Sequence, residues 1–224
     1  MDAAARNLIK FERSKTECLT REDLSRKGSI DEPIRHLVDM INNNQYYYTT
    51  STCSGRISLL EKPNENAGKK KGNIFLLNSH QPVELNQLLS VIQTFTSHGG
   101  SIPESCLWLR FEPFILHVQC FDLFKAKEFL NIALASGCRN SGMTLGKDNK
   151  ILVAVRSTSI LETPVCCQSL FQNLRRDYIE FLMRESNFRL AQNFERLARF
   201  ERGVQDYFEK LDNSELDDRD EAKS

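Results

Sequence analysis

The chain has 224 residues, enough for one sizeable domain with an appendage but short for two ordinary domains. Its 40% hydrophobic and 27% charged residues are typical of a globular protein. No apolar run approaches the roughly 18 residues that span a bilayer, and the first residues contain no apolar signal core. We therefore expect a cytoplasmic protein. The 30 basic and 30 acidic residues cancel, but an acidic segment at 212–224 leaves the remainder mildly basic, which permits an RNA-binding face without establishing one.

Helical and extended patterns alternate along the chain. Helices are predicted at 3–21 and 31–42, where Pro33 suits a first turn and apolar residues recur at helical spacing. Two β-prone segments, 46–50 and 57–60, flank a short polar loop. Pro113 is expected to interrupt a strand, and Gly99 and Gly137 are expected to end helices. The later predicted elements are strands at 73–78, 107–111, 114–120 and 151–156, a candidate strand at Met143 and Thr144, and helices at 83–98 and 123–135.

These elements predict an α+β (α/β-like) fold with a single mixed β-sheet and flanking helices. After Pro164, the segment 169–211 is predicted to be one long amphipathic helix or a broken pair. A helix that covers the core or dimerises, with a solvated basic face, is favoured over a dedicated RNA-binding arm. We therefore expect a domain at 1–165, a helical extension packed on it at 166–211 and a disordered acidic tail at 212–224.

Cysteine and histidine spacing indicates neither a disulfide framework nor a metal site. The seven cysteines form an odd set without C-x-x-C spacing, so we expect free thiols. The four histidines are scattered and show no H-E-x-x-H or comparable pattern, so no protein-bound metal is expected.

The run 49–57 places small hydroxyl residues, a thiol, a glycine and an arginine in one short segment. Gly55 allows a positive φ or a close backbone approach, and the Arg56 guanidinium can bind a carboxylate or phosphate through two parallel hydrogen bonds. The pattern therefore indicates an anion-binding loop. A Ser/Thr-rich strand end that turns into the next strand is an equally good interpretation of the composition.

Together with other segments, this run gives the chain a resemblance to a known family. The blocks that carry it are 23–31, 49–57, the Leu-x-Ser-His element at Leu77 to His80, 111–120 and 136–142. In this order they resemble the tRNA wybutosine-synthesizing protein 3 family, which consists of S-adenosylmethionine-dependent tRNA methyltransferases. The resemblance covers about 11–164 and depends on several ordered blocks, which is far more specific than one short motif.

The resemblance implies a reaction that composition alone would not suggest. It implies methylation of the N4 nitrogen of the 7-aminocarboxypropyl-demethylwyosine base beside the anticodon of phenylalanine tRNA, with S-adenosyl-L-methionine as cofactor. It also implies a fold unlike the Rossmann-type methyltransferases, and no G-x-G-x-x-G follows a first strand here. No membrane or DNA partner is expected, and a homo-oligomer is not indicated. The alternative function is a non-catalytic RNA-binding or partner-binding module.

Within the family blocks, residue types suggest roles. Arg56 and Arg139 are candidate clamps for a carboxylate of the cofactor or the modified base. Histidine is the residue type in these blocks whose unperturbed pKa lies near neutrality, so His80 and His117 are the candidates to accept a proton. The further candidates are Ser51, Ser54 and Ser141 beside Gly55 and Gly142 as hydrogen-bond donors, and Asp31 and Glu112 as acceptors for a ribose, the cofactor amine or the substrate N–H.

Several of these residues have plainer interpretations. Asp31 can be a helix N-cap, Arg139 can cap helix carbonyls, and His117 can be a core histidine. Cys53 is expected to be a small packing residue and not a nucleophile, because methyl transfer to nitrogen is a direct displacement. For RNA recognition, the candidate stacking rings and phosphate contacts are Tyr46, Tyr47, Tyr48, Phe75 and Trp108, and Lys69, Lys70 and Lys71.

Overall fold

A computed structural model describes residues 3–20, 29–63, 73–98, 100–101, 105–147, 150–167 and 174–221. The predicted α+β class with one sheet and a long C-terminal helix is confirmed. The sheet has six strands in the order β2-β1-β3-β5-β4, with β6 paired to β3, and each pair with a defined register is antiparallel. The elements are α1 (Ala3–Leu19), η1 (Glu32–Ile34), α2 (Arg35–Asn43), β1 (Tyr47–Lys62), β2 (Ile74–Ser79), α3 (Leu85–His98), β3 (Cys106–Cys120), α4 (Leu123–Ala135), β4 (Gly142–Leu145), β5 (Ile151–Val155), β6 (Leu161–Cys167) and α5 (Arg176–Glu221).

The chain divides into two compact units that alternate along the sequence. Unit 1 comprises Met1–Ser54, Phe114–Thr158 and Phe194–Ser224, and unit 2 comprises Gly55–Pro113 and Ser159–Asn193. Strands β1 and β3 and helix α5 each contribute residues to both units.

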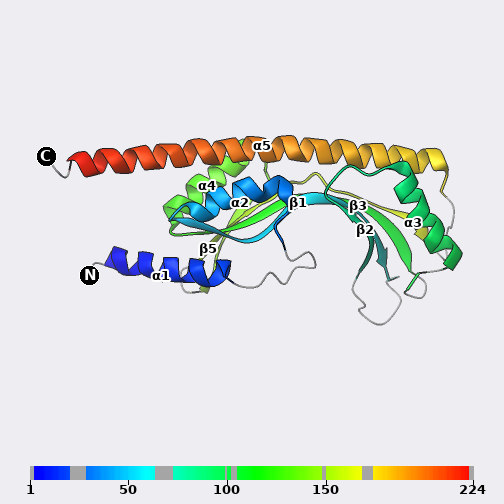
Figure 1. Ribbon diagram of the computed structural model, residues 1–224, viewed down its shortest axis with the longest axis horizontal. Helices are drawn as coiled ribbons and strands as arrows, with labels where there is room; N and C mark the ends of the chain where they lie inside the picture. Colours follow the sequence, from blue (N-terminus) through cyan, green and yellow to red (C-terminus); the bar gives the residue numbers. More distant parts are fainter. Residues whose placement is uncertain are drawn as a thin grey trace. The chain divides into compact units, whose positions relative to one another are not determined.

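Unit 1 has its core between the sheet and three helices. Figure 1 shows α2, α4 and the C-terminal part of α5 over one face of the sheet in this unit, and α1 on the other face. Apolar residues three or four positions apart place one buried stripe on α2, as expected for an amphipathic helix. The buried core residues include Leu37, Val38 and Ile41 of α2, Leu116 and Val118 of β3, Phe129 of α4, and Phe200 and Val204 of α5.

Unit 2 packs α3 and the N-terminal part of α5 against its part of the sheet. Leu88 and Phe95 are the buried residues of α3. The side chain of Asn187 in α5 accepts a hydrogen bond from Val83 N and donates one to Val83 O, both at 2.9 Å. Because both polar groups of the amide are used, this contact fixes the chain just before α3 to α5.

Two strands continue where the sequence predicted interruptions. The run 51–55, predicted to be a loop, lies inside β1, and Gly55 takes a positive φ of 95° there. Pro113, predicted to break a strand, lies inside β3 between the residues that pair with β6, ending at Phe111, and those that pair with β5, starting at Leu116. Pro113 is therefore tolerated because it sits where β3 passes from one antiparallel partner to the other.

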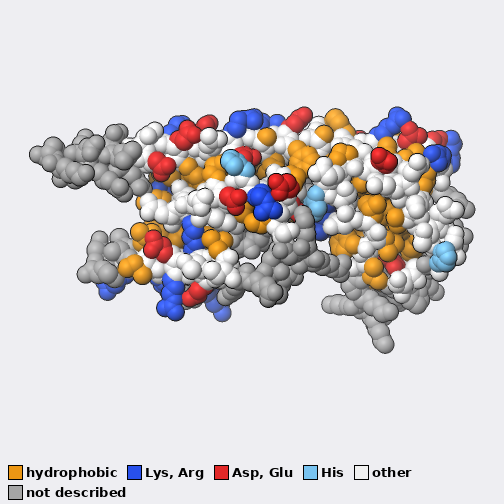
Figure 2. Space-filling model, in the orientation of Figure 1, with side chains coloured by type: hydrophobic (Ala, Val, Ile, Leu, Met, Phe, Trp, Pro, Cys, Tyr) orange, Lys and Arg blue, Asp and Glu red, His pale blue; other side chains and the backbone are white. Residues whose placement is uncertain are grey.

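The last strand and the last helix of the chain also differ from the prediction. Strand β6 was not predicted, because its polar residues and Pro164 conceal its pairing with β3. Helix α5 continues to Glu221 and does not stop at Leu211, since no glycine or proline follows until its end. Charged side chains line its outer surface (Figure 2), and no helix in the described part of the chain is apolar enough over sufficient length to cross a membrane.

The expectation that all cysteines are free was wrong for one pair. Cys106 and Cys167 form a disulfide in unit 2. They are directly opposite each other in the antiparallel pair of β3 and β6, with Cα atoms 4.1 Å apart. Sequence spacing cannot reveal this pairing, because it depends on the register of a strand that was not predicted. Cys18, Cys53, Cys120, Cys138 and Cys166 are not disulfide-bonded.

Helix α5 should contribute strongly to the stability of unit 1. Phe200 is fully buried, with its ring centroid 5.6 Å from Phe129 and 6.2 Å from Phe114. We expect Phe200→Ala to lower the free energy of unfolding by about 3–5 kcal/mol, because it removes a buried ring and leaves a cavity. Chemical denaturation should show this loss, whereas Arg199→Ala, on the exposed side of the same turn, should change stability by less than about 0.5 kcal/mol. Equal stabilities for the two variants would contradict this packing.

Candidate functional site

In unit 1 the structure joins two predicted site residues, Asp31 and Ser54. Asp31 is 7% exposed, and its carboxylate Oδ2 accepts a hydrogen bond from the backbone N of Ser54 at 2.9 Å. Asp31 occupies the N-cap position of η1, but its side chain makes no capping hydrogen bond. Asp31 therefore stands at the predicted N-cap position without capping the helix through its side chain, and the carboxylate instead connects the start of η1 to β1.

A second cluster in unit 1 is centred on Arg156, which sequence reasoning missed. The guanidinium Nη2 lies 3.2 Å from Nε2 of His117, and the backbone N of Arg156 donates to Ser141 Oγ at 3.0 Å. The register explains the contact, since His117 pairs with Ala154 and Arg156 follows on the same face of β5. The only sequence signal was a basic residue directly after a buried strand.

The environment keeps His117 neutral. Burial lowers its pKa from the ordinary value, and the positive charge of Arg156 lowers it further. Since a guanidinium only donates, Nε2 of His117 accepts from Arg156 and the ring proton resides on Nδ1. His117 is thus a neutral acceptor held by Arg156, and it can take up a proton only after Arg156 moves away.

Other predicted residues of unit 1 lie apart from these contacts. Arg139 is exposed in the turn after α4, and Ser51 is exposed on β1. Gly142 begins β4, and a Cβ placed there would meet no atom within 4 Å, so no close approach requires a glycine. Among the stacking candidates, Tyr47 is fully buried in the core, which excludes it as a platform for a base.

In unit 2, His80 and Gly55 come together. Nδ1 of His80 lies 2.8 Å from the carbonyl oxygen of Gly55, and because a carbonyl only accepts, Nδ1 carries the proton. The positive φ of Gly55 turns this part of β1 away from regular strand geometry. The glycine is therefore used for a backbone conformation that other residues rarely adopt.

Unit 2 also contains a row of alternating charges. Arg56 Nε donates to Glu112 Oε2 at 2.7 Å, and Arg110 approaches Glu112 Oε1 at 3.3 Å and Glu162 Oε2 at 3.1 Å. Lys62 pairs with the other oxygen of Glu162. Each carboxylate is thus shared by two cations, which leaves one more cation than anions in the row.

Aromatic rings accompany two cations of this row. The Arg56 guanidinium lies 5.0 Å from the centroid of Phe75, and the Lys62 ammonium 4.3 Å from that of Trp108. The side chains of Arg56 and Glu112 are 31% and 29% exposed, so solvent and ligands can reach them. Lys69, Lys70 and Lys71 lie outside the described residues, and their contact with RNA stays a prediction.

Comparisons with known proteins identify the relatives of this chain. Residues 10–206 match the family model described as Methyltransferase TYW3. The chain is 38% identical to the tRNA wybutosine-synthesizing protein 3 homolog of Bos taurus, over 89% of this chain and 74% of that protein. It is 32% identical to tRNA wybutosine-synthesizing protein 3 of Schizosaccharomyces pombe, over 90% of each chain. The solved structure of the PH1069 protein from Pyrococcus horikoshii superposes with a TM-score of 0.76 at 30% identity, over 89% of this chain and 98% of that one.

The lowered pKa of His117 predicts a pH-dependent stability. Its folded pKa lies below the unfolded value of about 6.5, so the unfolded state binds the proton first as pH falls. The contribution of neutral His117 to the free energy of unfolding is fully present above a pH of about 6.5. It decreases as the pH falls, until His117 in the folded state is protonated as well. Chemical denaturation between pH 8 and 5 should show that the free energy of unfolding falls more steeply for the wild type than for His117→Gln. The free energy of unfolding of Arg156→Gln should fall less than that of the wild type over the same pH range. Parallel plots of unfolding free energy against pH for all three proteins would contradict a lowered pKa of His117.

Proposed function

The chain belongs to the methyltransferase TYW3 family, and we propose that it methylates the N4 nitrogen of the 7-aminocarboxypropyl-demethylwyosine base beside the anticodon of phenylalanine tRNA, with S-adenosylmethionine as the methyl donor. Family membership makes the chain a tRNA methyltransferase of wybutosine synthesis. The names of its relatives support the pathway, and the chemistry of the described residues supports the donor and the base. A cytoplasmic location agrees with a tRNA substrate.

The Arg56–Glu112 pair is the observation that best supports this donor. The amino-acid end of S-adenosylmethionine carries a carboxylate and an ammonium group side by side. Arg56 offers guanidinium N–H groups beyond the Nε that binds Glu112, and Glu112 offers a carboxylate for the ammonium. A paired arginine and glutamate matches a zwitterion better than a simple anion, because the carboxylate of Glu112 repels a ligand that has only negative charge.

The residues of unit 1 suit the proton that the reaction releases. S-adenosylmethionine supplies an electrophilic methyl group, and the target nitrogen loses its proton as it gains that methyl. His117 is held neutral by burial and by Arg156, so it can accept a proton at Nε2 once Arg156 has moved away from that atom. Arg156 also binds an anion well, because its guanidinium donates to His117 through one nitrogen and retains other donors.

A non-catalytic RNA-binding or partner-binding module is the alternative. Titration of S-adenosylmethionine into the purified protein, followed by transfer of a labelled methyl group to tRNA from cells that lack this methylation, separates the two functions. We expect saturable binding of the donor and incorporation of label. Tight binding of tRNA without either result would favour the alternative.

Arg56→Ala should abolish methyl transfer and leave the fold intact. Loss of a charge-assisted hydrogen bond of about 1.5–3 kcal/mol weakens donor binding roughly ten- to a hundredfold. Calorimetric titration and initial rates should show this effect. Arg35→Ala is the matched control, because its pair with Glu32 is exposed and lies outside the candidate groups. Turnover and donor affinity near wild type for Arg56→Ala would remove Arg56 from the site.

Cys53→Ser should retain substantial activity, because direct displacement at the methyl group needs no covalent protein intermediate. Initial rates of methyl transfer test this expectation, with Cys18→Ser as a control at another half-buried free thiol. A methyl or tRNA adduct trapped on Cys53 and detected by mass spectrometry would contradict it, as would complete inactivity of the folded variant.

A further inference from the structure

Unit 1 contains a cavity that none of the contacts above explains. Residues of β1 and β3 alternate between the two faces of the sheet, so Tyr47, Leu116 and Val118 enter the core, whereas Tyr48 and Gln119 lie on the opposite face with His117. Helix α1 covers this opposite face (Figure 1). Between α1 and the sheet lies a cavity of about 490 Å³, a volume within the range of ligand sites.

The wall of the cavity is aromatic. Phe11 of α1 is 9% exposed, and its ring centroid lies 5.2 Å from that of Tyr48 and 5.6 Å from that of Phe121. All three rings line the cavity. Flat aromatic side chains that line a pocket favour a flat, largely apolar ligand over a compact polar one.

A buried amide supplies the polar recognition. Gln119 lines the cavity and is 7% exposed. Its Nε2 donates to the carbonyl oxygen of Ile151 at 3.0 Å, which fixes the orientation of the amide and leaves Oε1 as the atom that can meet a ligand donor. Exposed Lys10 and Lys150 also line the cavity and can attract an anionic group.

The position of Gln119 on β3 relates this cavity to His117, the candidate proton acceptor. Gln119 and His117 lie on the same face of β3, two residues apart, and therefore about 7 Å from each other along the strand. His117 and Arg156 do not line the cavity, so a group attached to a ring held against Gln119 has to extend along β3 to reach them. We propose that the cavity binds a purine ring, whose exocyclic or ring N–H donates to Gln119 Oε1 while its faces pack against the aromatic wall.

This proposal depends on the proposed function, in which two different purines take part. One is the adenine of the methyl donor and the other is the modified purine of the tRNA, and both have a flat ring with N–H donors. The experiment therefore needs one arm for each. S-adenosylhomocysteine serves as the probe for adenine, and tRNA that lacks this methylation serves as the probe for the target base.

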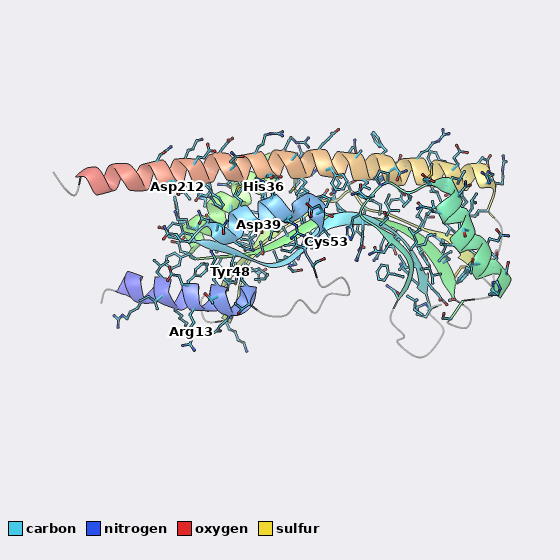
Figure 3. The ribbon with its side chains drawn as sticks, in the orientation of Figure 1. Arg13, His36, Asp39, Tyr48, Cys53 and Asp212 are labelled. Atoms are coloured by element: carbon cyan, nitrogen blue, oxygen red, sulfur yellow. A yellow bond between two sulfur atoms is a disulfide. The ribbon has the colours of Figure 1, made fainter. Side chains whose placement is uncertain are left out.

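A bulky residue in the cavity tests the proposal without removing an existing contact. Ser14 of α1 lines the cavity, so Ser14→Phe fills part of it. Arg13→Phe is the matched control, because Arg13 is exposed and its side chain points away from the sheet (Figure 3). Melting temperatures of both variants establish that each is folded.

We expect Ser14→Phe to weaken binding of one probe by tenfold or more and Arg13→Phe to weaken neither. A loss for S-adenosylhomocysteine assigns the cavity to adenine, and a loss for tRNA alone assigns it to the target base. Gln119→Met, which keeps the volume and removes the amide, should weaken the same probe by about five- to tenfold, the effect of one hydrogen bond of about 1–1.5 kcal/mol.

Unchanged affinity of folded Ser14→Phe for both probes would overturn the proposal. That outcome differs from failure of the proposed function, which would appear in the wild-type protein as absence of donor binding and of methyl transfer. If wild type binds the donor and methylates tRNA while Ser14→Phe equals it in both assays, the function stands and the purine cavity does not.

Discussion

The hydrogen bond from the backbone nitrogen of Ser54 to the buried Asp31 carboxylate is the contact on which the start of unit 1 depends. The carboxylate of a residue that is only 7% exposed has lost most of its water, and a backbone N–H at 2.9 Å replaces part of that hydration. Hydrogen bonds to charged groups contribute about 1.5–3 kcal/mol, a large share of the marginal stability of a protein. The contact fixes η1, and with it α2, to β1 immediately before the irregular backbone of Gly55.

The candidate arginines already have partners before any ligand binds. Glu112 positions Arg56 in unit 2, and in unit 1 the guanidinium of Arg156 contacts His117 while its backbone nitrogen donates to Ser141. Side chains held in one geometry lose less conformational entropy when a ligand arrives, so these contacts prepare the guanidinium groups for binding. They also impose selectivity, since a ligand anion at Arg56 must tolerate the adjacent carboxylate of Glu112.

Much of the fold was predictable because its helices carry strong local signals. The predicted helix at 123–135 coincides with α4, and Gly137 follows it with a positive φ of 89°, as a helix-ending glycine should. Strands were harder to predict, because their continuity depends on partners. The hydroxyl residues before Gly55 and the proline at 113 resemble loop signals, yet they lie inside β1 and β3, which are neighbours in the sheet. For the same reason β6 and the disulfide between Cys106 and Cys167 could not be predicted.

The candidate site was predictable as a set of residues but not as a set of contacts. The family blocks contain Asp31, Ser54, Arg56 and Glu112, and the structure pairs the first two and the last two. Arg156 lies outside every block, and only the register of β3 with β5 brings it to His117. The charged groups of the unit 2 row project from β1, β3 and β6, whereas in unit 1 Asp31 precedes η1 and Arg156 follows β5. A glycine-rich loop before a helix is not needed to present them. A sheet that places alternate side chains on one face can assemble donors and acceptors from distant segments, so a search for a contiguous cofactor motif misses a site of this kind.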